Sequence, residues 1–232
     1  MVRTTTWGLA ALIVLATACT KQNEAHPVAD SAGAVIQPTA TDVDKPQGGG
    51  DLPAGYVALA DRPNAQISDA KYTESDGRWE VRTGPAHIIY APKDSARGVY
   101  AVSTTIQQLE KPAHPEAYGI IFGGQHLDDR AAQRYGYFLV RGTGEYLLNV
   151  RDGDKVTKIV DWTASPNVPK EDASGKATYQ LRVHFAPDTV HLFVNGKLVA
   201  AAPKQGIPSD GIAGLRINHN LHLAVEPVKI QK

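Results

Sequence analysis

Polar side chains that could bind a ligand are concentrated near the end of the chain, in the sequence RINHNLH. Two asparagines and two histidines lie within the five residues 218–222. Paired imidazoles could bind a metal ion, whereas amides and imidazoles, which donate and accept hydrogen bonds, suit sugar hydroxyl groups. Strand alternation puts four polar side chains on one face: Arg216, Asn218, Asn220 and His222. His219 then points to the other face, so we predict a ligand-binding row rather than a metal site. His219 is expected to be a hydrogen-bonded histidine near the core, or the site of a bulge that reorients it.

A second polar row is predicted upstream, in the double hairpin YQLRVHFAPDTVHLFVNGKLVA. Asn195-Gly196 is a strong two-residue turn signal, and residues 186–189 form the four-residue loop before it. Closing both turns separates an apolar face from a polar one. The polar face is expected to lie beside the first row and to bind the same ligand through Gln180, Arg182, His184 and His191.

The register of this hairpin also predicts contacts. His184 lies opposite His191, with Cβ atoms about 4.5–5.5 Å apart. Arg182 lies opposite Phe193, close enough for a cation–π contact. Two facing imidazoles cannot both be protonated without cost, so we expect one of them to have a pKa below its ordinary value.

Other polar positions offer weaker candidates. The loop 123–135 carries Gln125 and His126, which we expect on the rim of the ligand site because loops beside a rigid sandwich often bind ligands. Asp152 and Asp154 could bind calcium, but Asp-Gly is first of all a hairpin turn. The sequence otherwise indicates no cofactor.

The elements that position these residues are strands. Alternating or apolar runs recur every 10 to 15 residues between Gly, Pro, Asn and Asp, which predicts an all-β sandwich of two antiparallel sheets. Short helical pieces are expected only near 128–133 and 161–164. Trp79 and Trp162 suit the core, with stacking on a sugar ring as the alternative. The expected strands are 79–82, 87–91, 98–106, 117–124, 135–141, 145–151, 179–185, 190–196 and 212–225.

The first 50 residues have a different character. A short apolar run, LAALIVL, follows Arg3 and precedes small residues, which is typical of a signal peptide over 1–18. The stretch LATAC resembles the lipobox of bacterial lipoproteins, and this resemblance implies cleavage before Cys19 and lipidation of its thiol. Residues 19–50 contain no aromatic side chain and no hydrophobic period, so a disordered tether is expected before a domain at 51–232.

Composition limits the partners. Lys and Arg together number 24, as do Asp and Glu, so the formal net charge is zero. The chain therefore lacks the excess of positive charge that would favour binding to nucleic acid. Cys19 is the sole cysteine, so no intramolecular disulfide can form, and the domain depends on its own core. Contact with a membrane is expected through the lipid alone.

Several segments resemble the concanavalin A-like lectin and glucanase superfamily. The superfamily resemblance is carried by VHFAPDTVHLFVNGKLVAAAP followed by DGIAGLRI. The segments EAYGIIFGG, YFLVRGTGEYLLNVRDG and GLRINHN also look like its laminin-G-like and 3-keto-disaccharide-hydrolase-like branches. The resemblance implies a jelly-roll sandwich over most of 55–230, but this fold supports lectins, hydrolases and adhesion modules alike. The carboxylate motif of family-16 glucanases is not matched, because Ser75-Asp76-Gly77 predicts a turn between Glu74 and Glu80.

The sequence therefore predicts a lipid-anchored domain of the cell envelope, periplasmic or on the cell surface, that binds a carbohydrate or glycan-like ligand. Two alternatives remain open: a glycoside or keto-sugar hydrolase, and a module that binds another envelope protein.

Overall fold

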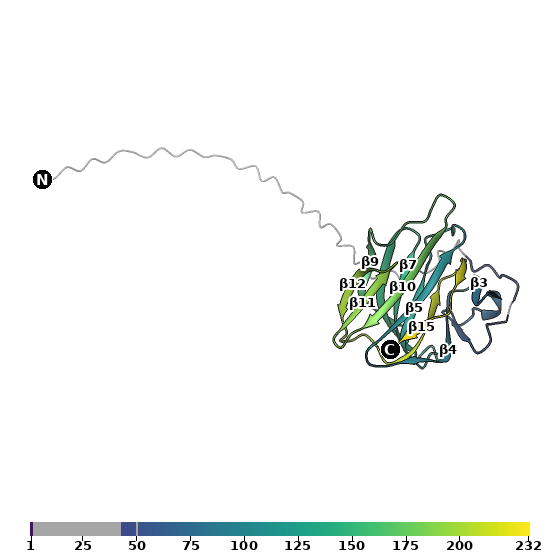
Figure 1. The fold of residues 1–232 in the computed structure, drawn as a ribbon, viewed down its shortest axis with the longest axis horizontal. Coiled ribbons are helices and arrows are strands. Elements are labelled where there is room, and N and C mark those ends of the chain that lie inside the picture. Colours follow the sequence, from purple (N-terminus) through teal and green to yellow (C-terminus); the bar gives the residue numbers. More distant parts are fainter. Residues whose placement is uncertain (2–42, 50) are drawn as a thin grey trace, which may run out of the picture. The chain divides into compact units, whose positions relative to one another are not determined.

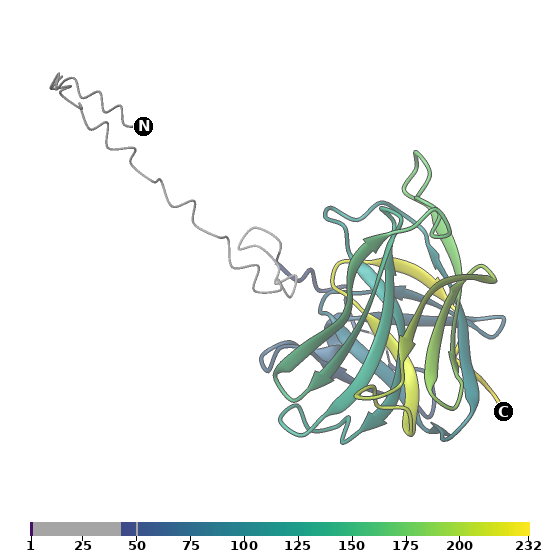
Figure 2. The same cartoon turned by 90° about the vertical axis from the view of Figure 1, so that its left-hand side faces the viewer.

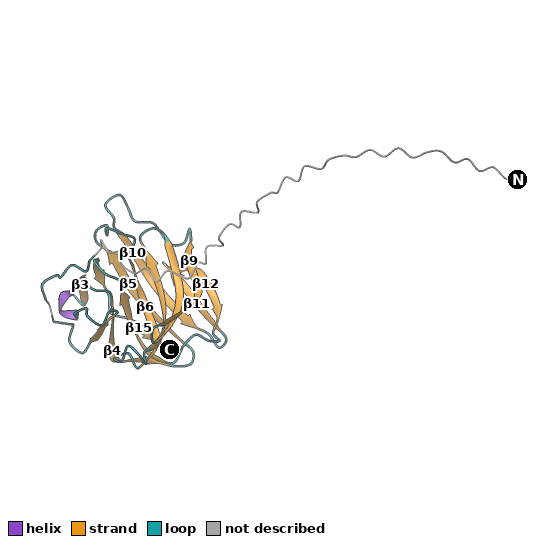
Figure 3. Cartoon of the chain, turned by 180° about the vertical axis from the view of Figure 1, so that it is seen from behind, coloured by secondary structure: helices purple, strands orange, loops and turns teal. Residues whose placement is uncertain are grey.

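The computed structural model describes Met1, residues 43–49 and residues 51–232 (Figure 1). Apart from Met1, the predicted signal peptide lies outside the described residues, as do Cys19 and most of the predicted tether. Within the described part, the chain forms fifteen strands and one short 3-10 helix, η1 (Ile67–Asp69), drawn in purple in Figure 3. This helix is not long and apolar enough to cross a membrane.

The strands form two antiparallel sheets, which Figure 2 views from the side. In spatial order, the seven-stranded sheet consists of β1 (Val57–Ala60), β4 (His87–Ala96), β13 (Gly211–Ile217), β6 (Ala117–Gln125), β7 (Arg134–Arg141), β8 (Glu145–Asp152) and β9 (Lys155–Ala164). The eight-stranded sheet consists of β12 (Lys197–Pro203), β11 (Thr189–Val194), β10 (Ala177–Phe185), β5 (Tyr100–Gln108), β14 (His222–Val225), β3 (Arg78–Arg82) and β2 (Lys71–Ser75), with β15 (Lys229–Gln231) also paired to β5. The predicted all-β sandwich is confirmed.

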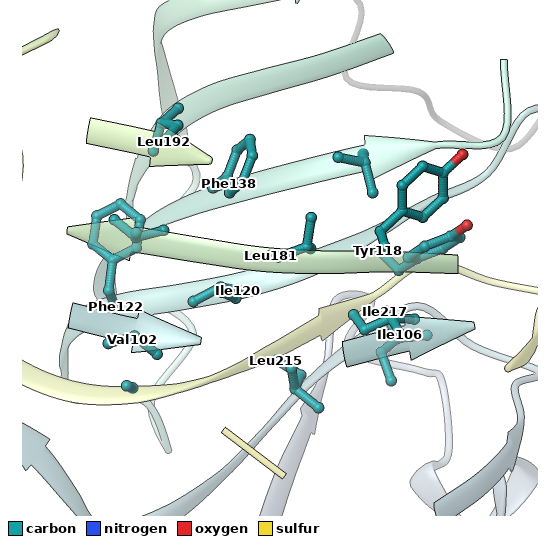
Figure 4. Close-up of a cluster of buried hydrophobic side chains, with 14 of the residues drawn as sticks. Val102, Ile106, Tyr118, Ile120, Phe122, Phe138, Leu181, Leu192, Leu215 and Ile217 are labelled. Carbon is teal, nitrogen blue, oxygen red and sulfur yellow. The ribbon is translucent and has the colours of Figure 1, made fainter. Parts of the chain in front are cut away.

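The main core lies between the two sheets and follows from strand alternation (Figure 4). Along β10, Tyr179, Leu181, Val183 and Phe185 are fully buried, while the residues between them point outward. The labelled side chains in Figure 4 come from both sheets, for example Leu181 from one and Phe138 from the other. Burying such side chains contributes about 1.5–3 kcal/mol each, so the period-2 pattern holds the two layers together.

The predicted double hairpin is confirmed in register. Phe185 pairs with Val190, and the pairing continues to Leu181 with Val194. Asn195 (φ 50°) and Gly196 (φ 76°) both have positive φ, as a two-residue turn of this kind requires. The turn predicted at Ser75-Asp76-Gly77 is also present, between β2 and β3.

The single strand predicted over 212–225 is wrong. β13 ends at Ile217 in the seven-stranded sheet, and β14 begins at His222 in the eight-stranded sheet. The connection passes through Asn220, whose φ of 52° lies in the left-handed region, away from extended backbone. Thr83 stabilises this crossover, since its hydroxyl donates to the Asn218 carbonyl (2.9 Å) and accepts from the Leu221 amide (2.8 Å).

The two predicted helical pieces are also absent from the described residues. Residues 161–164 belong to β9, and 128–133 form a series of turns. In the second case Asp129 closes the turns locally, because its carbonyl accepts from the amides of Ala132 and Gln133. Because helix nucleation is costly, a segment of only six residues satisfies its backbone groups through these turns and does not form a helix.

Candidate functional site

The predicted row of Arg216, Asn218, Asn220 and His222 does not exist as one surface. The crossover at 218–221 transfers the chain from one sheet to the other, so alternation cannot extend across it. Each of these four side chains has a different environment. The prediction of a single ligand-binding row over these four residues is therefore wrong.

Arg216 lies on the outer face of the seven-stranded sheet and is only 9% exposed. Its guanidinium forms a bidentate ion pair with Asp61, with Nη1 to Oδ1 at 2.8 Å, and it lies 5.4 Å from the centre of the Tyr137 ring. Burial would raise the pKa of Asp61, but the charge and hydrogen bonds of Arg216 outweigh burial and hold this pKa below its ordinary value. The arginine is therefore committed to an internal partner.

The asparagines and His219 bind other parts of the chain. The imidazole of His219 is buried, with Nε2 2.8 Å from Glu116 Oε1 and Nδ1 3.2 Å from Asp44 Oδ1. Asn218 donates to the same Glu116 carboxylate (3.0 Å). This confirms the prediction that His219 is hydrogen-bonded near the core.

Asn220 binds residues that were predicted to be part of the tether. Its side chain accepts from the Lys45 amide (2.9 Å) and donates to the Val43 carbonyl (3.2 Å). The Gln47 amide donates to the Asp69 carbonyl (3.0 Å). The segment 43–47 is thus bound to the domain, and Asn220 serves this contact.

The other predicted ligand-binding residues, His222, Gln125 and His126, do not form one surface either. His222 is on the eight-stranded sheet between two carboxylates, with Nε2 2.8 Å from Glu80 and Nδ1 3.3 Å from Glu110. Gln125 and His126 are exposed at the end of β6, in the seven-stranded sheet. Gln125 donates to the Asp210 carbonyl (3.4 Å).

The tryptophans and the acidic candidates have local explanations. Trp79 is a core residue, 2% exposed, whereas Trp162 is partly buried beneath the Arg141 guanidinium, 4.1 Å from its ring centre. Asp152 and Asp154 flank the β8–β9 turn at Gly153, and Asp152 lies 3.8 Å from Arg134. Among the described residues, no group of three or more His, Cys, Asp and Glu side chains is arranged to hold a metal ion.

The second predicted row is brought together as one surface. Gln180, Arg182 and His184 alternate outward along β10, and His191 and Phe193 do so along β11. In Figure 1, β11, β10, β5 and β15 run side by side in that order. The outer face of these four strands forms the candidate site.

The two histidines have the geometry that the loop length predicted. His184 pairs with His191, and their rings are stacked with centroids 5.8 Å apart and planes inclined by 24°. Partial burial, then the charges of Arg182 and His191, lower the pKa of His184 below its ordinary value. Both the register and the direction of the shift are as predicted.

A depression of about 280 Å³ opens beside this pair. It is lined by Ser103, Gln180, Arg182, Phe193, Gly196 and Gln231. The Arg182 guanidinium lies over the Phe193 ring, 5.2 Å from its centre, as the register predicted. Within the described part of the chain, the side-chain polar groups of Gln180, Arg182 and Gln231 form no hydrogen bond or ion pair with another residue, so they can bind a ligand.

Of these six lining residues, sequence reasoning had assigned only Gln180 and Arg182 to ligand binding. Ser103 faces Arg182 from β5, and Gln231 comes from β15 at the far end of the chain, where it pairs with Ala101. No local pattern links these residues to the hairpin. Phe193 did carry a signal, since it is a large aromatic side chain on the polar face of its strand.

Glu74 and Glu80, the carboxylates of the sequence nearest to the family-16 glucanase motif, lie on two different strands. Glu74 is on β2 and Glu80 is on β3, with the turn at Asp76-Gly77 between them. Glu74 pairs with Trp79, whereas Glu80 pairs with Thr73 and contacts His222. They therefore do not form the one-strand arrangement of that motif.

Comparison with known proteins identifies the fold. No family model matches the chain, and no curated protein matches it. A protein of unknown function with a galectin-like fold from Bacillus subtilis matches with a TM-score of 0.56 at 11% identity, covering 76% of this chain and 88% of that one. The carbohydrate-binding module CBM66 from Bacillus subtilis matches with a TM-score of 0.50 at 13% identity, covering 77% of this chain and 96% of that one.

Sheep galectin-11 is a more distant match, with a TM-score of 0.42 at 14% identity, covering 59% of this chain and 92% of that one. At such identities the similarity concerns the fold alone. The chain is thus a galectin-like β-sandwich, consistent with the concanavalin A-like architecture that its sequence resembles.

Proposed function

We propose that the domain binds a carbohydrate or glycan-like ligand in the depression on the outer face of the eight-stranded sheet. The observation that carries this proposal is the set of free polar groups around one aromatic ring. Two amides, a hydroxyl and a guanidinium line the depression beside Phe193. Sugar hydroxyls need donors and acceptors together, which amide and hydroxyl groups supply.

The outer face of the seven-stranded sheet is a weaker candidate. Its buried arginine is paired with Asp61, and Arg141 is paired with Glu145, with Nη2 to Oε2 at 2.8 Å. Its apolar side chains, such as Leu139 and Leu147, are largely buried. A ligand there would have to compete with these internal contacts, whereas the depression requires no such exchange.

The fold comparison supports a binding role without naming the ligand. One of the similar structures is, by its description, a carbohydrate-binding module. Folds of this kind serve many functions, so the argument for this chain rests on the depression itself.

Glycan-array screening, followed by calorimetry on the best ligands, tests the proposal. Replacing Gln180 with Ala removes one hydrogen-bonding group and should lower the affinity by about 0.5–1.5 kcal/mol. Gln107→Ala is the matched control, because Gln107 points outward from β5 but does not line the depression. Absence of glycan binding, or equal affinities for the two variants, would reject the proposal. Release of smaller sugars would favour the hydrolase alternative.

We propose further that the domain is exported and attached to a membrane of the cell envelope by a lipid on Cys19. The support is the sequence alone: a signal-peptide pattern over 1–18 followed directly by the sole cysteine. In that arrangement the residues between Cys19 and the bound segment 43–47 would link the lipid to the domain. The depression would then be presented to ligands outside the cytoplasm.

A further inference from the structure

Arg182 is a cation without an anionic partner in the described part of the chain. Ser103 on β5 pairs with Arg182 on one side and with Lys229 on the other. Lys229 is therefore the second basic residue in this line of paired residues across the sheet. Lys229 binds Glu226 (2.9 Å), and Arg78 binds the same carboxylate (3.1 Å). Glu226 is therefore shared by two cations, and Arg182 remains unpaired.

The depression around Arg182 has no acidic lining. Its six lining residues are Ser103, Gln180, Arg182, Phe193, Gly196 and Gln231. The stacked histidines lie next to Arg182 along both strands of the hairpin. The side chains nearest the guanidinium are thus neutral or basic, and the charge of the site is unbalanced.

The contact with Phe193 positions this charge. The guanidinium carbon lies 5.2 Å from the ring centre, over the ring. The guanidinium N–H groups form no hydrogen bond within the described part of the chain, and a planar carboxylate can accept two hydrogen bonds from them. Gln180, Gln231 and Ser103 surround that position with groups suited to hydroxyls.

We infer that the depression selects sugars that carry a carboxylate, namely uronic acid residues, with Arg182 binding the carboxylate and the amides binding ring hydroxyls. This inference rests on the proposed glycan binding and specifies its ligand class. A neutral sugar would leave the guanidinium without an anionic partner inside the site. An acidic sugar supplies the missing charge.

The test compares acidic oligosaccharides with their uncharged methyl esters. Calorimetry would measure binding of oligogalacturonate, oligoglucuronate and oligomannuronate, each beside its carboxyl methyl ester, together with neutral oligosaccharides. We expect at least one acid to bind about tenfold or more tightly than its ester, as loss of a charge-assisted hydrogen bond implies. Arg182→Gln should abolish this preference, so that acid and ester bind with equal affinity. Thermal unfolding would establish that the variant is folded.

Arg78→Gln is the matched control, since it removes the same charge from an exposed position on the same sheet. It should retain the preference for the acid. Equal affinity for acid and ester, or an unchanged preference in Arg182→Gln, would overturn the inference. If neutral glycans bind and no uronate does, the inference fails while the proposed function stands. If no sugar binds, both fail.

Discussion

His184 and His191 face each other across the β10–β11 hairpin, with ring centroids 5.8 Å apart and planes inclined by 24°. The pair borders the depression that we assign to ligand binding, next to Arg182. Its position follows from a loop of four residues, because one residue more or less would send the two rings to opposite faces. A cross-strand pair of this kind makes the electrostatics of the site depend on pH.

Stability should depend on pH through His184. Its pKa is lowered from the ordinary value of 6.5, so the unfolded chain binds a proton more readily than the folded one. The contribution of His184 is therefore complete above pH 6.5 and decreases as pH falls toward the folded pKa. Chemical unfolding across this range should show a shallower loss of stability in His184→Gln than in the wild type.

Two further measurements check this prediction. In NMR titrations, His191→Asn should move the pKa of His184 upward, because the charge of His191 is one cause of the lowered value. His126→Asn, in the exposed loop after β6, is the control, and its stability should change with pH as that of the wild type does. A titration curve for His184 at its ordinary value would contradict the prediction.

The buried pair of Arg216 and Asp61 should be essential for stability. Arg216→Met leaves Asp61 with only the more distant Arg151 (3.9 Å) and should lower the free energy of unfolding by about 3 kcal/mol, the low end of the range for a broken buried pair. Arg134→Met is the control, since Arg134 pairs with Asp152 at the surface, where such pairs contribute about 0–1 kcal/mol. Urea unfolding of both variants measures the difference, and equal losses would refute the assignment of a structural role.

This pair also predicts a loss of stability in acid. The pKa of Asp61 is held below its ordinary value of 3.8, so its contribution is complete above that pH and decreases as pH falls through the folded pKa. Comparing wild type with Asp61→Asn at neutral and acidic pH would isolate this effect. A difference between the two proteins that stays constant across the range would show that Asp61 does not titrate as expected.

The attachment of residues 43–47 should depend on Asn220. Asn220→Gly retains the positive φ but removes the side-chain bonds to Lys45 and Val43. We expect faster hydrogen exchange at the Lys45 amide, while stability falls only by about 0.5–1.5 kcal/mol per lost bond. Asp76→Gly, at a turn with nearly the same φ (53°), is the control. Unchanged exchange at Lys45 would show that Asn220 does not retain this segment.

Membrane attachment should depend on Cys19. Cys19→Ser removes the only thiol, so the protein should leave the membrane fraction or remain unprocessed. Gln22→Ala, three residues downstream, is the control and should behave as the wild type. Fractionation and mass spectrometry of the N-terminal peptide provide the measurement. A Cys19→Ser protein that is processed and remains in the membrane fraction would rule out the lipid anchor.

The hairpin that forms half of the candidate site could be predicted because its information is local. Asn195 and Gly196 determine one turn, the four residues 186–189 determine the other, and alternation then assigns each side chain to a face. These interactions lie within about twenty residues of sequence. The contacts of Arg182 with Phe193 and of His184 with His191 followed from that register alone.

What the sequence by itself determined is therefore the sheet class, the hairpin register and the polar face of β10 and β11. Only the tertiary structure decided that the chain changes sheets at Asn220, because Thr83, 135 residues before Asn218, holds that crossover. It also decided that Ser103 and Gln231 complete the depression, since β5 and β15 reach it through pairings between distant segments. Local alternation reports which face a side chain takes within one strand, but the choice of neighbouring strand depends on how the whole core packs.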